Sequence, residues 1–532
     1  MSSLPRITLA QTHVRLADLN VNLAGIRQAV ADSRGQADLL VFPALALTGH
    51  ALQDRWHYPH VMEAVEALLP QLCELSHAMP FLLGLPRRID DRLYESLCLF
   101  QDGALAWQYN RQLFSPDPVL DNARYFSAGH NQPWLDFNGV RLGVCLGDEI
   151  HMSAVQQQLR DAKPALVINP ASDLFTHDCL PSRFAQLADS ARQLGCPLLR
   201  VNPVGGQDEH VFDGHSLLLA ADGRLLQRAD GFVPELLPVD LQPASQPAAL
   251  PCTEALTWQA LVLSLRDYVA ACRFKGSLLG LSGGIDSALV LALAVDALGA
   301  DQVTAVMMPY HYTAQISQDD AAEQAHMLGV AYHVAPVSPL VEPFIEQLQP
   351  LLQHWPTPAQ DTTEQNLQAR SRGMLLMALS NRSGALLLTT SNKSEMAVGY
   401  CTLYGDMCGG FALLKDIPKT LVYRLAAYRN TVAPAIPERV ITRPPTAELA
   451  PGQEDSDSLP PYPLLDEIVR LYVEENRSLQ QLLDAGLDAD WVQHVTRMID
   501  RNEFKRRQAA PGPRLSRRGF GSERRMPMSG RL

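Results

Sequence analysis

The stretch Ser277-Leu-Leu-Gly-Leu-Ser-Gly-Gly-Ile-Asp-Ser287 decides how the second half of this chain folds. A short apolar run comes first, two glycines follow, and residues 288–298 then supply helix formers and apolar side chains. This order predicts a strand, a tight turn and a helix. Glycine lets the turn approach a ligand closely, and the N–H groups of the turn and of the first helical residues carry partial positive charge. Such a turn is shaped to hold phosphate groups.

The side chains of this turn strengthen the prediction. Ser282 and Ser287 offer hydroxyl donors, and Asp286 offers a carboxylate that can hold a magnesium ion beside the phosphates. The turn is not a Walker A loop, because no lysine follows the second glycine and the spacing differs. It resembles the pyrophosphate loop of the N-type ATP pyrophosphatases, which split ATP into AMP and pyrophosphate. A helix cap that binds nothing is the competing interpretation.

Strands and helices alternate after the turn. Helices are expected near 317–328 and 364–381, and strands at 303–307, 332–335 and 385–389. This order predicts a doubly wound parallel sheet, in which ligands bind at the carboxyl ends of the strands. The turn, Met308-Pro309 and residues 390–395 all follow such ends.

The first half mixes strands and helices differently. Asp18 can cap a helix that runs to about Ala31, and the turns Asp102-Gly103 and Asp222-Gly223 join pairs of strands. Further strands are expected at 7–10, 38–42, 81–85, 141–146, 165–168 and 198–201. The mixture predicts a layered α/β sandwich.

Length and composition limit the class of protein. A chain of 532 residues should hold more than one core, and 47% hydrophobic with 19% charged residues is typical of a globular protein. The net charge of −13 argues against nonspecific nucleic-acid binding. The nine scattered cysteines form no CxxC pair, which indicates reduced thiols, a cytoplasmic setting and no zinc site. No run reaches the ~18 apolar residues of a membrane helix, and the start lacks a signal-peptide core.

Two segments stand out by composition. Prolines punctuate residues 233–255, which we interpret as an extended linker between an N-terminal domain, 1–240, and a C-terminal domain, 257–532, with the linker proper at 241–256. Residues 501–532 are rich in lysine and arginine. They form a solvated tail, a cover over a polyanionic ligand or, least favoured, an RNA-binding segment. The acidic segment 452–459 either orders over a substrate or stays loose.

Five stretches of the second half share the pattern of one known family: 274–300, 366–370, 388–407, 436–445 and 504–508. On these residues the second half closely resembles the NAD synthetases, and the whole chain is similar to their long, glutamine-dependent form. The resemblance implies a pyrophosphate-loop sheet behind a nitrilase-like α-β-β-α sandwich.

The implied reaction is the amidation of deamido-NAD. Its nicotinate carboxylate attacks the α-phosphate of ATP, giving an acyl-adenylate and pyrophosphate, and ammonia then displaces AMP. The resemblance puts a magnesium ion on Asp286 and Glu395. It puts ATP on Gly280, Leu281, Ser282, Gly283, Gly284, Ile285, Asp286, Ser287 and Thr390, with Lys393 as a further phosphate candidate. It puts deamido-NAD on Asn366, Glu395, Tyr400, Cys401, Thr402, Leu403 and Lys505.

The first half resembles the nitrilase-like amidotransferase domain at 41–49, 109–112, 121–126, 139–143 and 204–214. Those domains hydrolyse glutamine with a cysteine nucleophile, a glutamate base and a lysine that stabilises the oxyanion. In this chain Ala44 stands at the glutamate position, Arg111 at the lysine position and Gly147 at the cysteine position. Asp117 and Asn122 replace a glutamine-contacting tyrosine and an acid.

These departures predict a retired glutaminase domain that persists as scaffold. Cys145 is a poor substitute, because in a strand it would be displaced by about 6.6 Å from position 147 and would lie among apolar residues, where thiols are usually inert. Ammonia would then come from solution or from a separate amidotransferase. The resemblance also suggests a homo-oligomer.

Alternatives remain open at this point. One is a glutamine-dependent synthetase whose glutaminase site uses other residues. Others are a regulatory protein that only binds nucleotide, and a member of the pyrophosphatase superfamily that acts on a different acid.

Overall fold

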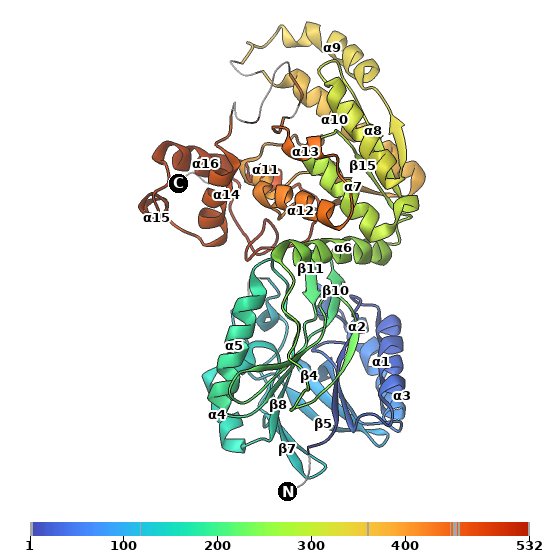
Figure 1. Ribbon diagram of the computed structural model, residues 1–532, viewed down its shortest axis with the longest axis vertical. Helices are drawn as coiled ribbons and strands as arrows, with labels where there is room; N and C mark the ends of the chain where they lie inside the picture. Colours follow the sequence, from blue (N-terminus) through green and yellow to red (C-terminus); the bar gives the residue numbers. More distant parts are fainter. Residues whose placement is uncertain are drawn as a thin grey trace. The chain divides into compact units, whose positions relative to one another are not determined.

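The computed structural model describes residues 4–116, 119–358, 361–446, 448–450, 455 and 458–529. The chain forms two compact units, Met1–Pro251 and Cys252–Leu532 (Figure 1). Asp117 and most of the acidic segment 452–459 lie outside the described residues. Within them, no helix combines the length and the apolar character that spanning a membrane requires.

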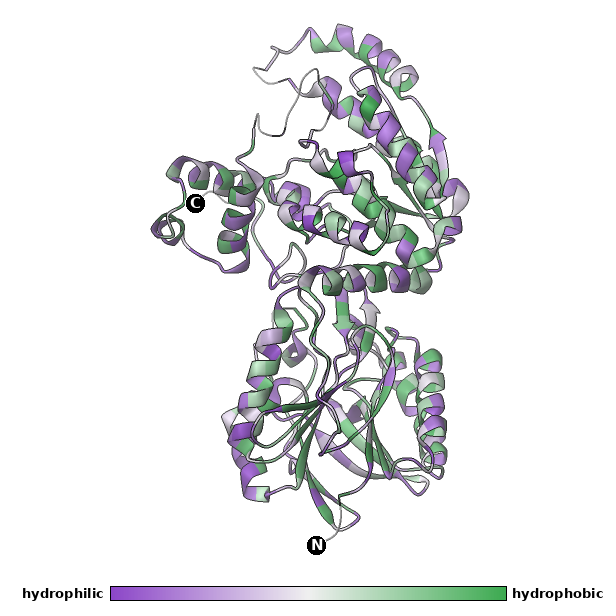
Figure 2. Ribbon diagram, in the orientation of Figure 1, coloured by the Kyte–Doolittle hydropathy of each residue, from purple (hydrophilic) through white to green (hydrophobic). Residues whose placement is uncertain are grey.

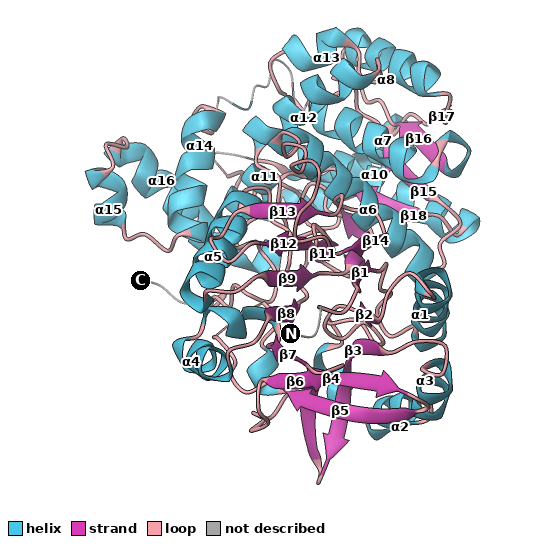
Figure 3. Ribbon diagram, turned by 60° about the horizontal axis from the view of Figure 1, so that its bottom comes forward, coloured by secondary structure: helices cyan, strands magenta, loops and turns pink. Residues whose placement is uncertain are grey.

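Unit 1 is built on two mixed sheets, which Figure 3 shows edge-on. The first has the order β14-β1-β2-β3-β4-β5, with bounds Glu235–Pro238, Ile7–Gln11, Leu39–Val41, Phe81–Ile89, Arg92–Gln101 and Ala104–Asn110. The second has the order β13-β12-β9-β8-β7-β6, with bounds Leu225–Arg228, Leu217–Leu219, Leu198–Val201, Leu166–Pro170, Val140–Val144 and Trp134–Phe137. A separate hairpin pairs β10 (Val204–Gln207) with β11 (His210–Asp213).

The two sheets pack face to face through one apolar core that contains Leu9 and Val41 from the first and Val144 and Ile168 from the second. A second core fills the space between the first sheet and α1 (Leu19–Ser33), α2 (Pro59–Glu66) and α3 (Leu69–Leu75). A third lies between the second sheet and α4 (Ser153–Ala162) and α5 (Cys179–Leu194). Figure 2 shows the hydrophobic residues gathered along the central strands. The predicted α-β-β-α sandwich is therefore confirmed.

Local signals in unit 1 act as expected at the start of α1 and at the two predicted strand turns. The Asp18 side chain accepts from the N–H of Val21 at the start of α1. β4 pairs with β5 across the turn 102–103, and β12 pairs with β13 across the turn 222–223. A third turn, at 90–91, joins β3 and β4 and was not predicted. The first part of the proline-rich segment 233–255 belongs to unit 1 and is not a linker, because β14 pairs with β1 at the edge of the first sheet.

Unit 2 is built on a parallel sheet with the order β17-β16-β15-β18-β19, with bounds Ala331–Val334, Val303–Met307, Ser277–Gly280, Leu386–Thr389 and Phe411–Ala412. α9 (Ser338–Leu352) and α10 (Thr363–Ser383) pack on the face that carries Leu278, Val306 and Leu387. The other face is covered by α7 (Ile285–Leu298) and α8 (Gln315–Leu328), backed by α6 (Thr253–Cys272) and α12 (Lys419–Val432). The predicted doubly wound sheet is confirmed. α6 begins inside the segment 241–256.

A helical bundle completes unit 2 and was not foreseen from the sequence. It contains α14 (Tyr462–Val469), the π-helical turn η6 (Arg470–Glu474), α15 (Leu479–Asp484), α16 (Ala489–Arg501) and α17 (Glu503–Arg506), and it packs on α11 (Lys393–Val398). The basic segment 501–532 is only partly solvated over its described part, because Arg506, Arg514 and Arg524 are buried whereas Arg501, Arg507, Arg517 and Arg525 are exposed.

Candidate functional site

The glycine turn of unit 2 connects β15 to α7 and is braced by its two serines. The hydroxyls of Ser282 and Ser287 are 3.0 Å apart, and the Ser287 hydroxyl donates to the carbonyl of Gly284. The Gly284 N–H donates in turn to the Ser282 oxygen at 3.2 Å. The first N–H groups of α7 have no acceptor within the helix, so the turn presents them outward as donors.

Gly283 is the position where glycine is required. Its φ is +79°, and a Cβ there would lie 2.2 Å from the carbonyl oxygen of Ser317 on α8. Any other residue would be strained and would also push the turn away from α8. The turn is therefore packed tightly against α8, which fixes its shape before any ligand arrives.

Two carboxylates meet beside the turn at one buried ammonium. Lys419 Nζ lies 2.5 Å from Asp286 Oδ2 and 3.4 Å from Glu395 Oε1, and the Lys419 side chain is 2% exposed. Asn392 donates from its side chain to Asp286 Oδ1 at 3.0 Å, and its N–H donates to Glu395. The predicted metal ligands are thus brought together from α7 and α11, which are far apart in the sequence.

Burial dominates the titration of this cluster. Burial, reinforced by the charge of Asp286, raises the pKa of Glu395 well above its usual range, although Lys419 opposes the shift. Burial disfavours the charge of Lys419, yet Asp286 and Glu395 together raise its pKa. Asp406 lies in the same cavity, and burial raises its pKa to about 6.

The acid pair fits a nucleotide-bound magnesium ion better than a metal held by protein alone. Among the described residues, no group of three or more His, Cys, Asp or Glu side chains is arranged to hold a metal. Magnesium prefers oxygen ligands and commonly takes one or two carboxylates, with phosphates and waters completing its shell. Asp286 and Glu395 supply that number on the side of the turn where phosphates would lie.

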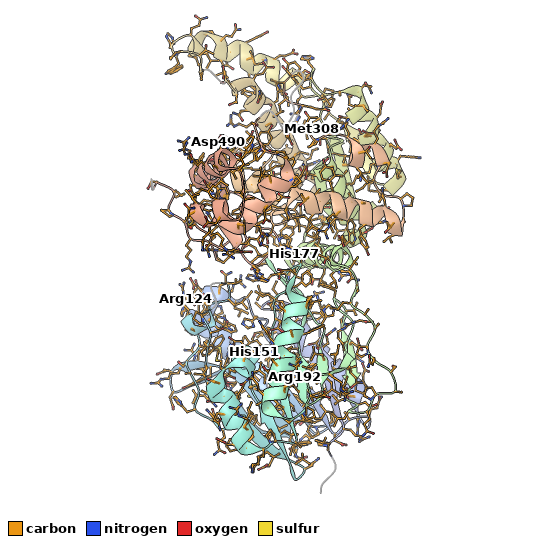
Figure 4. The ribbon with its side chains drawn as sticks, turned by 60° about the vertical axis from the view of Figure 1, so that its left-hand side comes forward. Arg124, His151, His177, Arg192, Met308 and Asp490 are labelled. Carbon is orange, nitrogen blue, oxygen red and sulfur yellow. The ribbon has the colours of Figure 1, made fainter. Side chains whose placement is uncertain are left out.

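A cavity of about 280 Å³ opens at the carboxyl ends of β15, β16 and β18. All of the predicted ATP residues except Gly283 line this cavity, Thr390 included. Met308, labelled in Figure 4, closes the side next to β16. Arg372, Asp406, Lys419, Tyr423 and Arg443 line it too, and sequence reasoning missed them.

The predicted deamido-NAD residues divide into two groups. Glu395, Tyr400 and Thr402 line the cavity, and the Thr402 hydroxyl donates to the side-chain oxygen of Asn366 at 2.9 Å. Asn366, Cys401, Leu403 and Lys505 are not among the lining residues. The ammonium of Lys505 instead donates to the carbonyls of Gly399 and Cys401, at 2.7 and 2.8 Å.

In unit 1, the positions singled out at 111 and 147 are in contact. Gly147 has φ +55°, and a Cβ on it would lie 3.4 Å from the guanidinium of Arg111. That guanidinium is buried, donates to Glu95 at 2.9 Å and pairs with Asp148. Its Nε donates to the carbonyl of Leu113. The three guanidinium nitrogens of Arg111 are therefore all paired, with Glu95, Asp148 and the Leu113 carbonyl, next to Gly147.

Ala44 and Cys145 belong to different cores of unit 1. Ala44 packs in the core between the two sheets, together with Tyr109 and Leu146. Cys145 packs in the core under α4 and α5. It is fully buried, and burial followed by the charge of Glu149 raises the pKa of its thiol well above the usual range. The thiol therefore stays protonated and is inert.

Comparison with known proteins identifies the family. Residues 257–509 match the family model described as NAD synthase, and residues 6–248 match the carbon-nitrogen hydrolase model. A glutamine-dependent NAD(+) synthetase from Acinetobacter baylyi is 42% identical over 534 residues, which cover 98% of this chain and 98% of that protein. The chain belongs to the NAD synthetase family. Members are ATP-dependent ligases that form a carbon–nitrogen bond, so this protein is an enzyme of that class with ATP as co-substrate.

Other members of the NAD synthetase family agree in length and fold. The glutamine-dependent NAD(+) synthetase of Synechocystis is 38% identical, over 98% of both chains. The structure of the glutamine-dependent NAD+ synthetase from Acinetobacter baumannii, in complex with adenosine diphosphate, has 39% identity and a TM-score of 0.79 over 98% of both chains. The enzyme from Cytophaga hutchinsonii, at 23% identity and a TM-score of 0.83 over 99% of this chain and 98% of that one, shares the fold.

Two lysines differ from what the sequence predicted for the cavity of this family member, Lys393 and Lys419. Lys393 does not reach the cavity, because its buried ammonium contacts Asp416 at 2.9 Å and Glu474 at 2.5 Å. Lys419 does reach it, from the first turn of α12. A lysine directly after Pro418 opposes the positive end of the helix dipole, and that local conflict is the signal that could have marked it.

Proposed function

We propose that this protein forms NAD by amidating deamido-NAD at the cavity of unit 2, through an acyl-adenylate, with release of pyrophosphate and AMP. The observation that carries the proposal is the convergence of the glycine turn with Asp286, Glu395 and Lys419. A carboxylate that attacks a phosphate group must overcome like-charge repulsion. A cavity with outward N–H donors and a buried ammonium reduces that repulsion.

Some residues of the cavity bind the phosphates of ATP, and others neutralise charge. The N–H groups of residues 285–287, at the start of α7, hold the β- and γ-phosphates, and the Thr390 hydroxyl donates to the oxygens of the same phosphate groups. A magnesium ion on Asp286 and Glu395 would supply charge neutralisation at the phosphates. Lys419 neutralises the two acids before ATP arrives and then faces the incoming phosphate charge. Tyr400 and Thr402 line the side where the pyridine acid enters.

We also propose that the nitrogen donor is ammonia and that unit 1 has lost its glutaminase activity. Gly147 offers no nucleophile and Ala44 no base, and the Arg111 guanidinium is held by Glu95 and Asp148. Loss of one member of such a set typically costs roughly 10⁴–10⁶ in rate. Unit 1 would remain as scaffold, in a homo-oligomer that draws ammonia from solution or from a separate amidotransferase.

A second candidate function differs only in the nitrogen donor, which would be glutamine. The curated relatives are named glutamine-dependent, which favours a glutaminase site built from residues other than 44, 111 and 147. The two candidates predict different substrates for the same synthetase cavity.

One assay tests adenylation of deamido-NAD and the choice of nitrogen donor separately. Purified protein is given Mg-ATP and deamido-NAD, and pyrophosphate and NAD are measured with ammonium, with glutamine or with neither. The proposal expects pyrophosphate that depends on deamido-NAD, and NAD only with ammonium. No pyrophosphate under any condition would remove the synthetase proposal, and glutamine-supported NAD would remove the ammonia proposal.

A further inference from the structure

The carboxyl end of α11 is held by side chains from a distant part of the chain. α11 has only six residues, and the last carbonyls of a helix have no partner within it. The carbonyl of Glu395 accepts from the N–H of Tyr400 at 3.0 Å. The carbonyls of Met396, Ala397 and Val398 accept instead from the corner between α16 and α17.

Three residues of this corner supply the donors. Asn502 Nδ2 donates to Val398 O at 2.8 Å. Arg506 Nη1 donates to Ala397 O at 2.5 Å and, more weakly, to Met396 O at 3.4 Å. Lys505 Nζ extends the set to Gly399 O and Cys401 O. Two of the three donors are cations at a helix carboxyl end, where the helix dipole favours positive charge.

The fit between Gly399 and Asn502 is too close for any other residue at 399. Gly399 has φ +71°, and a Cβ there would lie 2.2 Å from Asn502 Cγ. The Asn502 amide therefore lies directly against the backbone where α11 ends and the following loop begins. Its second contact, to the carbonyl of Met498 at 2.9 Å, ties the same amide to α16.

The corner is itself braced by buried charges. Glu503 accepts from Arg506 at 3.0 Å and from Arg524 at 2.7 Å, and the Phe520 ring lies 5.2 Å from the Arg506 guanidinium. α16, which begins at Ala489 just before the Asp490 labelled in Figure 4, buries Val492, Val495 and Ile499 against the core shared with α11. The donors are thus fixed in position by the bundle.

α11 carries a cavity acid, and the loop after it lines the cavity. Glu395 is the third residue of α11, and Tyr400 and Thr402 follow it. We propose that Asn502 and Arg506 are positioning residues for the synthetase reaction, which hold the 396–403 segment so that the cavity can accept the acid substrate. This inference rests on the proposed function, and it gives the C-terminal bundle a role in binding deamido-NAD.

The test compares matched substitutions in the full-length protein. Asn502→Asp keeps the side-chain shape but replaces the donor with an acceptor that faces Val398 O. Arg506→Gln removes the cation, and Arg506→Lys retains a donor. Arg507→Gln is the control, because neighbouring Arg507 is half exposed and contacts Glu503 and Met526 but no carbonyl of α11. Two independent positions are changed so that misfolding of one variant does not decide the result.

We expect KM for deamido-NAD to rise about tenfold in Asn502→Asp and in Arg506→Gln, since each removes one or two hydrogen bonds of about fivefold each. Arg506→Lys should recover part of that loss, and Arg507→Gln should match the wild type. The dissociation constant for ATP without magnesium should stay within twofold, because the glycine turn does not contact this corner. Amide exchange across 396–403 should accelerate in the first two variants.

Unchanged KM, with kcat falling only in proportion to the folded fraction, would overturn the inference in favour of a merely structural role. Unchanged exchange across 396–403 would overturn it as well. If the wild type makes no pyrophosphate from ATP and deamido-NAD, the proposed function fails by itself. The inference about substrate binding falls with it, and the exchange data then report only whether the corner holds the loop.

Discussion

Replacement of Lys419 by methionine tests the electrostatic design of the cavity. The lysine is 2% exposed and is the cation that faces both Asp286 and Glu395. Methionine keeps most of the side-chain volume and removes the charge. Removing one partner of a buried ion pair typically costs about 3–5 kcal/mol.

For Lys419→Met at neutral pH, we expect a loss of stability near the lower end of this range. Burial and the charge of Asp286 raise the pKa of Glu395, which reduces the charge of that acid at neutral pH and so the negative charge left uncompensated when Lys419 is removed. A loss of about 3 kcal/mol corresponds to roughly 6–12 °C in melting temperature at about 2–4 °C per kcal/mol. The raised pKa means that stability from Glu395 falls as pH rises from about 4.5 towards that raised pKa. Without Lys419 that fall continues to higher pH, so the difference between variant and wild type should widen between pH 7 and 9.

The assay is thermal unfolding at pH 7 and pH 9, with EDTA and with magnesium. Magnesium should restore part of the lost stability in Lys419→Met, because it binds the folded acid pair and not the unfolded chain. Arg424→Met is the matched control on the same helix, since its ion pair with Glu254 is 57% exposed on the arginine side and such surface pairs contribute at most about 1 kcal/mol. A Lys419→Met protein that melts within 2 °C of the wild type at both pH values would refute this reasoning.

Two further predictions concern the glycines. Gly147→Cys should give a thiol that can be alkylated in the folded protein, because position 147 is only half-buried, whereas fully buried Cys145 stays unlabelled. Glutamine hydrolysis should remain absent, and its appearance in this single variant would contradict the lost-base argument. Gly283→Ala should lower ATP affinity at least tenfold and lower the free energy of unfolding by at least about 2 kcal/mol, since its Cβ would meet Ser317 O at 2.2 Å with φ at +79°. Calorimetry with ATP measures the affinity, and a denaturant titration measures the stability. Wild-type values in both would show that the turn is not packed tightly against α8.

The sequence predicted those parts of the molecule that depend on local pattern. The strand, glycine turn and helix at 277–298 follow from residues that are adjacent in the chain, and both sheets of unit 1 follow from short apolar runs separated by turns. The parallel order then brings the turn and residues 390–395 to one edge, because strand ends in such a sheet share an edge.

The parts that were missed depend on charge pairs between distant segments. Lys419 lies 133 residues from Asp286, and no local pattern joins them. Lys393 looks like a phosphate ligand from its position, but Asp416 and Glu474 bury it. The basic segment 501–532 looks solvated from its composition, but Glu503 within it pairs with Arg506 and Arg524. The long-range contact that the sequence could not show is the one from Arg506 to the carbonyl of Ala397.

We propose that the NAD formed by this enzyme takes its amide nitrogen from ammonia and not from glutamine bound to unit 1. A decisive measurement supplies glutamine labelled with ¹⁵N at the side-chain amide together with unlabelled ammonium, and the mass of the NAD that is formed is then determined. We expect unlabelled NAD and no glutamate beyond that of a protein-free control. NAD that carries ¹⁵N in its nicotinamide group would contradict this proposal.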